Sequence, residues 1–295
     1  MKRIDLISSQ FPSGVAWLLN FFVENNILVY RGENVVSTWK VTNGNYELQD
    51  GQNVLKQWLP CLSEKKSITF SDRVSIRWSH EFPGSNNSKQ KTVLLVRDGR
   101  DCIYSQFKRE EKYTNFHDML KYGTEPFNLN PSETWALHNY LWLKKIPKDE
   151  IFVIKFEDIK SDPFPVLKKM LNFLEIELTD EQIVKGIESS SFDRAKKAEE
   201  EYRKQTDVTQ FKQVNRKGIV GEWKSVYGKE ELGLFQGFPN HILKKLGYEV
   251  SGSCEYSSNY IFGVRIKMYL SKLKKYCFNF VRKLFHYFKK IIYLK

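Results

Sequence analysis

The start of the chain joins a short apolar run to a loop of small residues, and this pairing constrains the fold more than any other feature. Residues 4–7 read as a strand and residues 18–24 as a helix, with Ser-Gly-Val-Ala-Trp at positions 13–17 between them. Small residues at a strand-to-helix turn let backbone N–H groups close around an anion at the positive end of the helix. The pattern predicts a phosphate-binding loop, although the two glycines and Lys-Ser/Thr of the common P-loop are absent. Packing alone is the alternative reason for a glycine there.

A second apolar run, residues 92–96, is β-branched-rich and continuous, as expected of a buried parallel strand. Arg97 follows this run directly, and residues 102–110 then read as a helix that carries Ser105. An arginine at the carboxyl end of such a strand points into the crevice where open α/β sheets bind ligands. Arg97 and Ser105 are therefore candidates to share one phosphate, with a surface ion pair as the alternative role for Arg97.

Two adjacent cations, Arg216 and Lys217, lie far downstream in Asn-Arg-Lys-Gly-Ile-Val-Gly-Glu-Trp-Lys, which begins at residue 215. Arginine binds phosphate through a planar fork and lysine through a point charge. The segment is therefore a third candidate for phosphate binding. Between the motifs, the sequence predicts a helix at 132–143 and a strand at 151–156, followed by residues 158–174, in which Asp162-Pro163 opens a further helix.

In order and spacing, the three segments resemble the PAPS-dependent sulfotransferase family over residues 4–228. That family has a 5′-phosphosulfate loop, an Arg and a Ser eight residues apart for the 3′-phosphate, and a late Arg-Lys-Gly-x-x-Gly-Asp-Trp-Lys motif. Here Arg97 and Ser105 have that spacing, and Glu222 replaces the Asp of the late motif. The resemblance implies a P-loop-like α/β fold over residues 1–250, a single domain whose central, mostly parallel sheet is flanked by helices.

The resemblance also assigns residues to the cofactor PAPS. The loop would hold the 5′-phosphate through backbone amides, and Trp17 would stack on the adenine unless it is a core aromatic. The later motifs would hold the 3′-phosphate. The assigned residues are Ser13, Gly14, Val15, Ala16, Trp17, Arg97, Ser105, Arg216, Lys217 and Gly218. The family uses no metal, and the chain shows no Cys/His spacing typical of a metal site.

Residues 74–83 look like the family's Lys-Thr-His-Leu-Pro segment, in which the His takes the proton of the acceptor hydroxyl. Alternating apolar residues predict a strand that would deliver His80 to the carboxyl edge of the sheet. A histidine is a suitable general base near neutral pH. Glu81 is the alternative base, because related members use a Glu.

The family's catalytic Lys precedes Ser-Gly in the loop, and this chain has Pro12 there. Losing one such electrostatic stabiliser costs on the order of 10²–10³ in rate when nothing replaces it. Arg77, or a reoriented Arg216 or Lys217, is the expected substitute. Two alternatives to an active enzyme therefore stay open. One is a degenerate protein that binds PAP(S) without transfer, and the other is a P-loop nucleotide-binding protein such as a nucleotide kinase.

The C-terminal tail, residues 256–295, contains ten Lys/Arg and no Asp/Glu. It accounts for ten of the net charge of +12, which leaves +2 for residues 1–255. Apolar residues recur there at helical spacing: Ile266, Leu270, Leu273, Cys277, Val281, Leu284, Phe288 and Ile291. A cationic amphipathic helix of this kind is typical of a membrane surface, so we expect residues 263–292 to bind one. Packing on protein or in a dimer is the alternative, and no nucleic-acid partner is expected.

These observations predict a sulfotransferase that moves the sulfonate of PAPS to a hydroxyl, with a membrane-associated or lipid-linked glycan as the expected acceptor. The four cysteines show no disulfide framework, which suits a reducing compartment. The first residues lead straight into a strand, with no run typical of a signal peptide or anchor. The predicted location is therefore the cytoplasm, peripheral on the inner face of the membrane.

Overall fold

The computed structural model describes most of the chain. The described residues are 1–9, 11–49, 55, 59, 62, 67–84, 90–110, 113–122, 129–205, 215–270 and 273. They form two compact units, residues 1–112 with 138–225 and residues 113–137 with 226–295. Each unit is described by itself. The predicted division into residues 1–250 and 256–295 stays a prediction.

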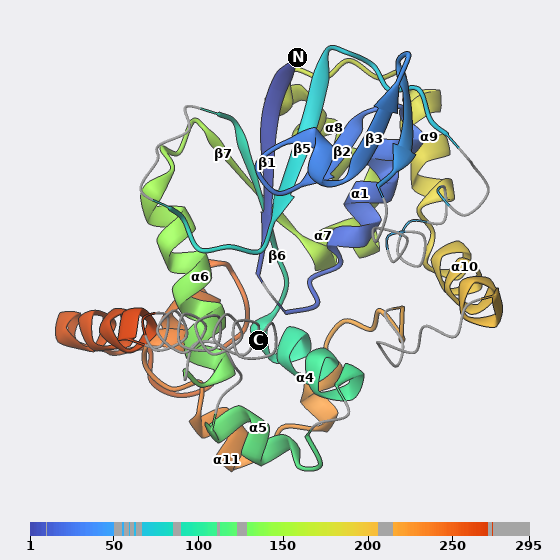
Figure 1. The fold of residues 1–295 in the computed structure, drawn as a ribbon. Helices are drawn as coiled ribbons and strands as arrows, with labels where there is room; N and C mark the ends of the chain where they lie inside the picture. Colours follow the sequence, from blue (N-terminus) through green and yellow to red (C-terminus); the bar gives the residue numbers. More distant parts are fainter. Residues whose placement is uncertain are drawn as a thin grey trace, which may run out of the picture. The chain divides into compact units, whose positions relative to one another are not determined.

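A five-stranded sheet with the order β2-β5-β1-β6-β7 lies at the centre of the first unit (Figure 1). Each neighbouring pair is parallel. The strands of the sheet are β1 (Lys2–Ser8), β2 (Leu28–Arg31), β5 (Val74–Ser79), β6 (Thr92–Val96) and β7 (Ile151–Lys155). A separate antiparallel hairpin pairs β3 (Trp39–Thr42) with β4 (Asn45–Leu48). The carboxyl ends of the five parallel strands therefore share one edge, which is where such sheets bind ligands.

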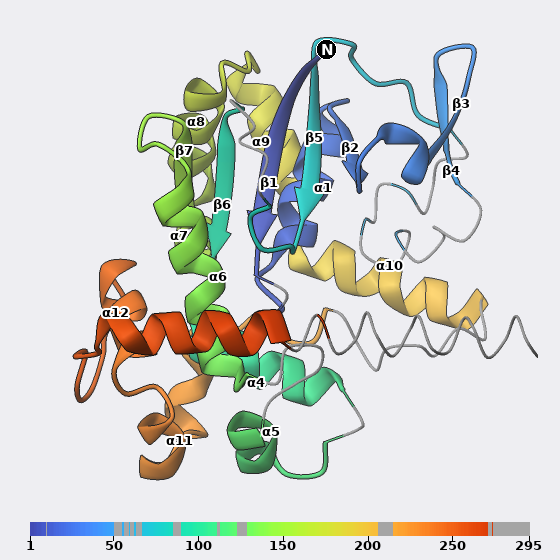
Figure 2. The ribbon, with the colours of Figure 1, turned by 60° about the vertical axis from the view of Figure 1, so that its left-hand side comes forward.

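Helices pack on the sheet because its strands present apolar side chains to them, and β6 is buried throughout. One face of the sheet forms a core with α1, α8 and α9, including Leu6, Phe22 and Leu171 (Figure 2). The helices of the first unit are α1 (Val15–Glu24), α4 (Gly99–Arg109), α7 (Phe156–Ser161), α8 (Pro163–Leu174), α9 (Asp180–Ser189) and α10 (Phe192–Gln205). Helix α6 (Pro131–Lys145) has residues in both units.

The second unit contains α5 (Phe116–Tyr122), α11 (Lys229–Gly233), α12 (Phe238–Lys245) and a helix over residues 258–270. Ser132 Oγ donates to the Leu234 carbonyl at 2.6 Å. Tyr260 Oη donates to Glu133 Oε1 at 2.5 Å, which ties the helix over 258–270 to the start of α6. None of the helices among the described residues is long and apolar enough to cross a membrane.

The predicted α/β class with a central parallel sheet is confirmed. The helix predicted to open at Asp162–Pro163 is α8, and the residues just before it form a separate short helix, α7. The cause is local, because proline at the first position of α8 cannot continue the hydrogen bonding of α7. Helix α4 begins at Gly99, three residues before the predicted start, because the Asp98 carboxylate caps it by accepting from the Arg100 N–H at 2.9 Å.

Candidate functional site at the carboxyl edge of the sheet

The predicted phosphate loop is the turn between β1 and α1. Gly14 is the N-cap of α1 with φ +86°, a left-handed conformation that favours glycine. A Cβ built on Gly14 would lie 2.3 Å from Cδ2 of Phe156, so the ring of Phe156 closes on the space that glycine leaves open. No side chain of the described residues caps the helix, so its first N–H groups are available to an anion.

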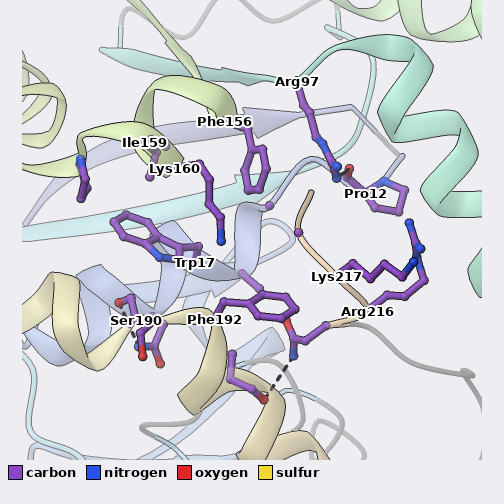
Figure 3. A pocket seen from close by; sticks show the side chains of 18 of the residues that line it. Pro12, Trp17, Arg97, Phe156, Ile159, Lys160, Ser190, Phe192, Arg216 and Lys217 are labelled. Carbon is purple, nitrogen blue, oxygen red and sulfur yellow. Dashed lines mark hydrogen bonds between the residues drawn. The ribbon is translucent and has the colours of Figure 1, made fainter. Parts of the chain in front are cut away.

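A cavity of about 300 Å³ lies beside this turn (Figure 3). Its walls come from the turn and α1, from Arg97 and Ser105, from α7, and from the ends of α9 and α10 with residues 215–218. It therefore brings together all three motifs that the sequence singled out. Of the predicted cofactor residues, the lining includes Gly14, Ala16, Trp17, Arg97, Ser105, Arg216, Lys217 and Gly218. Ser13 and Val15 belong to the same turn.

Arg97 joins two of the three motifs. It follows the last residue of β6 and is buried, and its guanidinium donates from Nη1 to the Pro12 carbonyl at 3.2 Å and from Nη2 to the Ile219 carbonyl at 2.9 Å. The guanidinium carbon lies 4.7 Å from the ring centroid of Phe156. A single cation thus holds the first loop, the end of β6 and the late segment at one point of the cavity wall.

The late segment is anchored on α4 by a buried carboxylate. Asp101 accepts from the Gly221 N–H at 2.7 Å and from the Trp223 N–H at 2.9 Å. Burial raises the pKa of Asp101, and the two backbone donors oppose that rise. Arg100 stacks on Trp223, with the guanidinium carbon 3.6 Å from the ring centroid. These contacts hold the second half of the late segment on α4, and with it the position of Arg216 and Lys217 in the first half.

The two cations differ in how they are held. Arg216 pairs with Glu222 through both guanidinium nitrogens, one of them 2.9 Å from Oε1. The hydrogen bond raises the pKa of Arg216 and lowers that of Glu222. Lys217 is more exposed, and its Nζ lies 3.7 Å from Glu222 Oε1. The carboxylate that replaces the family's Asp therefore orients Arg216 and leaves Lys217 more accessible to a ligand.

The cavity lining also includes residues that sequence reasoning did not assign to the site, among them the two aromatic rings of Phe156 and Phe192 and the ammonium of Lys160. Figure 3 shows the rings of Phe156 and Phe192 on opposite sides of the cavity. Trp17 and Lys160 lie to one side of the two rings, toward Ser190. Lys160 Nζ lies 5.2 Å from the ring centroid of Phe192. The helix-start pattern of α10 could have pointed to Phe192, but no local signal marks Lys160, which reaches the cavity through the turn between β7 and α8.

His80 follows β5 and adjoins the first loop through β1. Its Nδ1 lies 2.9 Å from Ser8 Oγ and 3.3 Å from the Ser8 carbonyl oxygen. A carbonyl can only accept, so the geometry assigns the proton to Nδ1 and leaves Nε2 as the basic nitrogen. His80 is outside the lining of the 300 Å³ cavity, at the neighbouring strand end.

The pKa of His80 is lowered to about 4, chiefly by burial, with the charges of Arg31 and Arg109 adding to the effect. Hydrogen bonds to backbone carbonyls of Ser8 and Ser9 oppose the shift. The imidazole is therefore neutral, and so in its basic form, across the physiological range. Glu81, the alternative base, is exposed; its N–H bonds Ser79 Oγ and its carbonyl accepts from Trp142 Nε1 at 3.0 Å.

Arg77, expected as a substitute for the missing lysine, lies on the other face of the sheet. It donates from Nε and Nη2 to the two carboxylate oxygens of Asp5, at 2.9 and 2.8 Å. The pair lines a second cavity of about 260 Å³ together with Glu81 and Trp142. Side chains alternate along a strand, so Arg77 and His80 point to opposite faces. The structure does not bring Arg77 to the loop.

A phosphate-type turn, buried cations and aromatic walls at the carboxyl edge of a parallel sheet define an α/β protein with a nucleotide-sized cavity. The sequence profile of the sulfotransferase domain matches residues 27–245, about three quarters of the chain. The chain belongs to the sulfotransferase family.

The known proteins that this chain resembles include named sulfotransferases. Sulfotransferase 2A6 of Mus musculus is 24% identical over 243 residues, which cover 76% of this chain and 79% of that protein. The 3-beta-hydroxysteroid sulfotransferase of Cavia porcellus is 26% identical over 247 residues, which cover 76% and 78%. Mouse sulfotransferase SULT7A1 complexed with PAP has a TM-score of 0.52 at 21% identity, covering 79% of this chain and 81% of that one. A retinol dehydratase in complex with retinol and PAP gives 0.51 at 17% identity, covering 85% and 83%. At these identities the solved structures show the shared fold.

The close approach of Phe156 to the loop gives a stability prediction. Gly14→Ala should destabilise the protein by more than the roughly 1 kcal/mol that a left-handed glycine alone contributes, because the new methyl meets the Phe156 ring. Gly44→Ala is the matched control, since Gly44 has φ +78° with no atom within 4 Å of an added Cβ. Urea unfolding of both variants checks this. Equal losses of stability in the two variants would show that the Phe156 ring moves aside freely. If the ring stays in place, adding Phe156→Ala to Gly14→Ala should recover part of the lost stability.

Proposed function

We propose that the protein is a sulfotransferase that takes PAPS as its sulfonate donor and a hydroxyl as its acceptor. The observation that carries the proposal is the convergence of the loop, Arg97 and the late cations on one cavity. Three buried donor atoms there have no hydrogen-bond partner among the described residues: Ser13 Oγ, Arg97 Nε and Arg216 Nε. Buried donors of this kind are normally satisfied, so unmet donors beside a cavity favour a polyanionic ligand.

The residues fit the parts of PAPS as follows. The N-terminal turn of α1 and Ser13 would hold the 5′-phosphosulfate end, where helix N–H groups favour negative charge. Arg97, Ser105, Arg216 and Lys217 would hold the 3′-phosphate. Trp17 and Phe192 offer aromatic faces for the base. When bound, PAPS supplies the sulfonate group that is transferred.

In the chemical step, His80 would accept the proton of the acceptor hydroxyl at Nε2. Its Nδ1–H contact with the Ser8 carbonyl keeps the imidazole in the required tautomer and orients the ring toward the loop. The missing lysine leaves the loop with Pro12, whose carbonyl accepts from Arg97. Arg97 therefore adjoins the loop, although its proposed place is at the 3′-phosphate.

The second candidate function is nucleotide binding without transfer, because Pro12 stands where the family has its catalytic lysine. Without an ammonium before Ser13, a protein could hold the nucleotide and transfer nothing. His80→Ala separates the two cases, since a transferase loses turnover and keeps its affinity for adenosine 3′,5′-bisphosphate. A nucleotide kinase would instead prefer ATP with Mg²⁺ to the bisphosphate.

For the acceptor, we propose a membrane-associated or lipid-linked glycan, met at the cytoplasmic membrane surface. The names of the relatives point to steroids and retinol, so this part of the proposal rests on the tail alone. The described helix over 258–270 buries Val264 and Met268 and exposes an apolar stripe. That stripe comprises Phe262, Ile266, Tyr269, Leu270 and Leu273. The predicted continuation from Cys277 to Ile291 lies outside the described residues.

Calorimetry with adenosine 3′,5′-bisphosphate tests the donor site. Wild type should bind at micromolar Kd, and Arg97→Ala should bind at least about 30-fold more weakly, because the buried charge, its unmet Nε donor and the contacts that hold the loop to the late segment are all lost. Arg73→Ala, an exposed change at the opposite edge of the sheet, is the control and should bind as wild type. Thermal unfolding of both variants must stay cooperative. No binding to wild type would refute the proposal.

The lowered pKa of His80 sets the pH dependence. The base form is present above the folded-state pKa, so kcat/KM should stay flat through pH 6.5 and fall only as pH approaches about 4. NMR titration of the imidazole, assigned by its absence from His80→Ala, gives the pKa without turnover. Circular dichroism at each pH separates titration from acid unfolding. A midpoint near 6.5 would contradict the burial of this side chain.

Sedimentation with vesicles tests the tail. Wild type should pellet with anionic phosphatidylglycerol vesicles and much less with neutral phosphatidylcholine, and salt should weaken the binding. Phe262→Ser with Leu270→Ser should release the protein by removing exposed apolar surface. A wild type that ignores both vesicles and sediments as a dimer would assign the stripe to self-association.

A further inference from the structure

The carboxyl edge of the sheet carries one more cation that the proposed mechanism does not use. Arg31 is the last residue of β2, and it stands in register with Trp78 of the neighbouring β5. Trp78 is in register with Leu6 of β1, so these side chains share the face on which His80 and Ser8 lie two residues further on. Arg31 and His80 therefore belong to the same face and the same edge.

Both side chains contact the same buried indole. The guanidinium carbon of Arg31 lies 5.1 Å from the ring centroid of Trp78, and the His80 ring centroid lies 5.4 Å from it. Trp78 is 1% exposed, so it is a fixed platform for both. An arginine seated on an aromatic ring keeps the N–H groups in its plane available for hydrogen bonds.

The described residues leave those donors without an acceptor. The backbone N–H of Arg31 bonds Thr38 Oγ1 at 2.9 Å, but its side chain has no hydrogen bond or ion pair with any residue that the structure describes. By contrast, the terminal nitrogens of Arg97 and Arg216 are already paired, with two carbonyls and with Glu222, and only the Nε of each is unmet. Arg31 is exposed, so a carboxylate or phosphate from solution can reach it.

The order of strands places Arg31 on the acceptor side. Along the edge, the sequence of strand ends is Arg31 on β2, His80 after β5, the loop after β1 and Arg97 after β6. The donor nucleotide would lie over the loop and Arg97. A hydroxyl at His80 thus lies between the donor and Arg31, and the rest of the acceptor extends toward β2.

We propose that Arg31 selects an anionic acceptor, one whose reacting hydroxyl is accompanied by a carboxylate or phosphate that binds the guanidinium stacked on Trp78. This rests on the proposed sulfotransferase function and names its substrate class. Neutral acceptors would leave the arginine without a partner and so bind less well. A fork-shaped donor pair is suited to both oxyanions.

Matched acceptor pairs test the proposal on the full chain saturated with donor. The pairs are 4-nitrophenyl β-D-glucuronide with the glucoside, and 4-hydroxyphenylacetate with 4-hydroxyphenylacetamide; each pair differs in the anionic group. Turnover with PAPS gives kcat/KM, and calorimetry in the presence of adenosine 3′,5′-bisphosphate gives affinity without turnover. Wild type should favour the anionic member of at least one pair by about tenfold or more.

Three variants complete the experiment. Arg31→Gln should erase the preference in affinity and leave the affinity for the neutral member unchanged, Arg31→Lys should keep part of the preference, and Arg73→Gln should keep all of it. The proposal is overturned if wild type shows no preference or binds no member of either pair. It is equally overturned if Arg31→Gln lowers kcat for charged and neutral members alike, since the arginine would then act on the transferred group. Failure to bind the bisphosphate would instead refute the donor site.

Discussion

The Arg97 guanidinium is the contact on which the site depends. It is buried at the end of β6 and donates hydrogen bonds to the Pro12 and Ile219 carbonyls. It therefore holds together segments more than a hundred residues apart. Its face lies over Phe156, which in turn closes on Gly14. Any anion bound at the turn of α1 therefore sits against a charge that is already fixed in place, and little has to be reorganised on binding.

The sequence predicts the parts of this arrangement that follow from local pattern. Period-two alternation and continuous apolar runs locate β5 and β6, and parallel strands bring their carboxyl ends to one edge. Helix α4 and the proline break at Asp162 follow from capping and ring chemistry. The same alternation shows why Arg77 is not at the loop, because residues 77 and 80 differ by an odd number and face opposite ways. The alternation along β5 was therefore enough to predict that Arg77 and His80 lie on opposite faces of the sheet.

Long-range contacts are what the sequence could not supply. Lys160 enters the cavity because α7 is a short turn of helix between β7 and α8, and Phe192 enters because α9 ends beside α1. Lys160 carries no local signature, and the helix start at Phe192 does not by itself place that ring at the cavity. The bidentate pairing of Arg216 with Glu222 is also a matter of loop geometry, since six residues in an irregular segment can bring the two together or hold them apart. These residues shape the cavity, and their positions in it can be assigned only once the fold is known.

Charge at the acceptor side connects the base to the substrate. Arg31 carries no counter-charge among the described residues, and its field is one reason that the pKa of His80 is lowered. With its pKa lowered to about 4, the imidazole is unprotonated at physiological pH but takes a proton with less driving force. On the proposed mechanism, an anion bound to Arg31 would offset that field and so raise the pKa of His80 as the acceptor binds. Recognition of a charged acceptor and the strength of the proposed base would then depend on the same arginine.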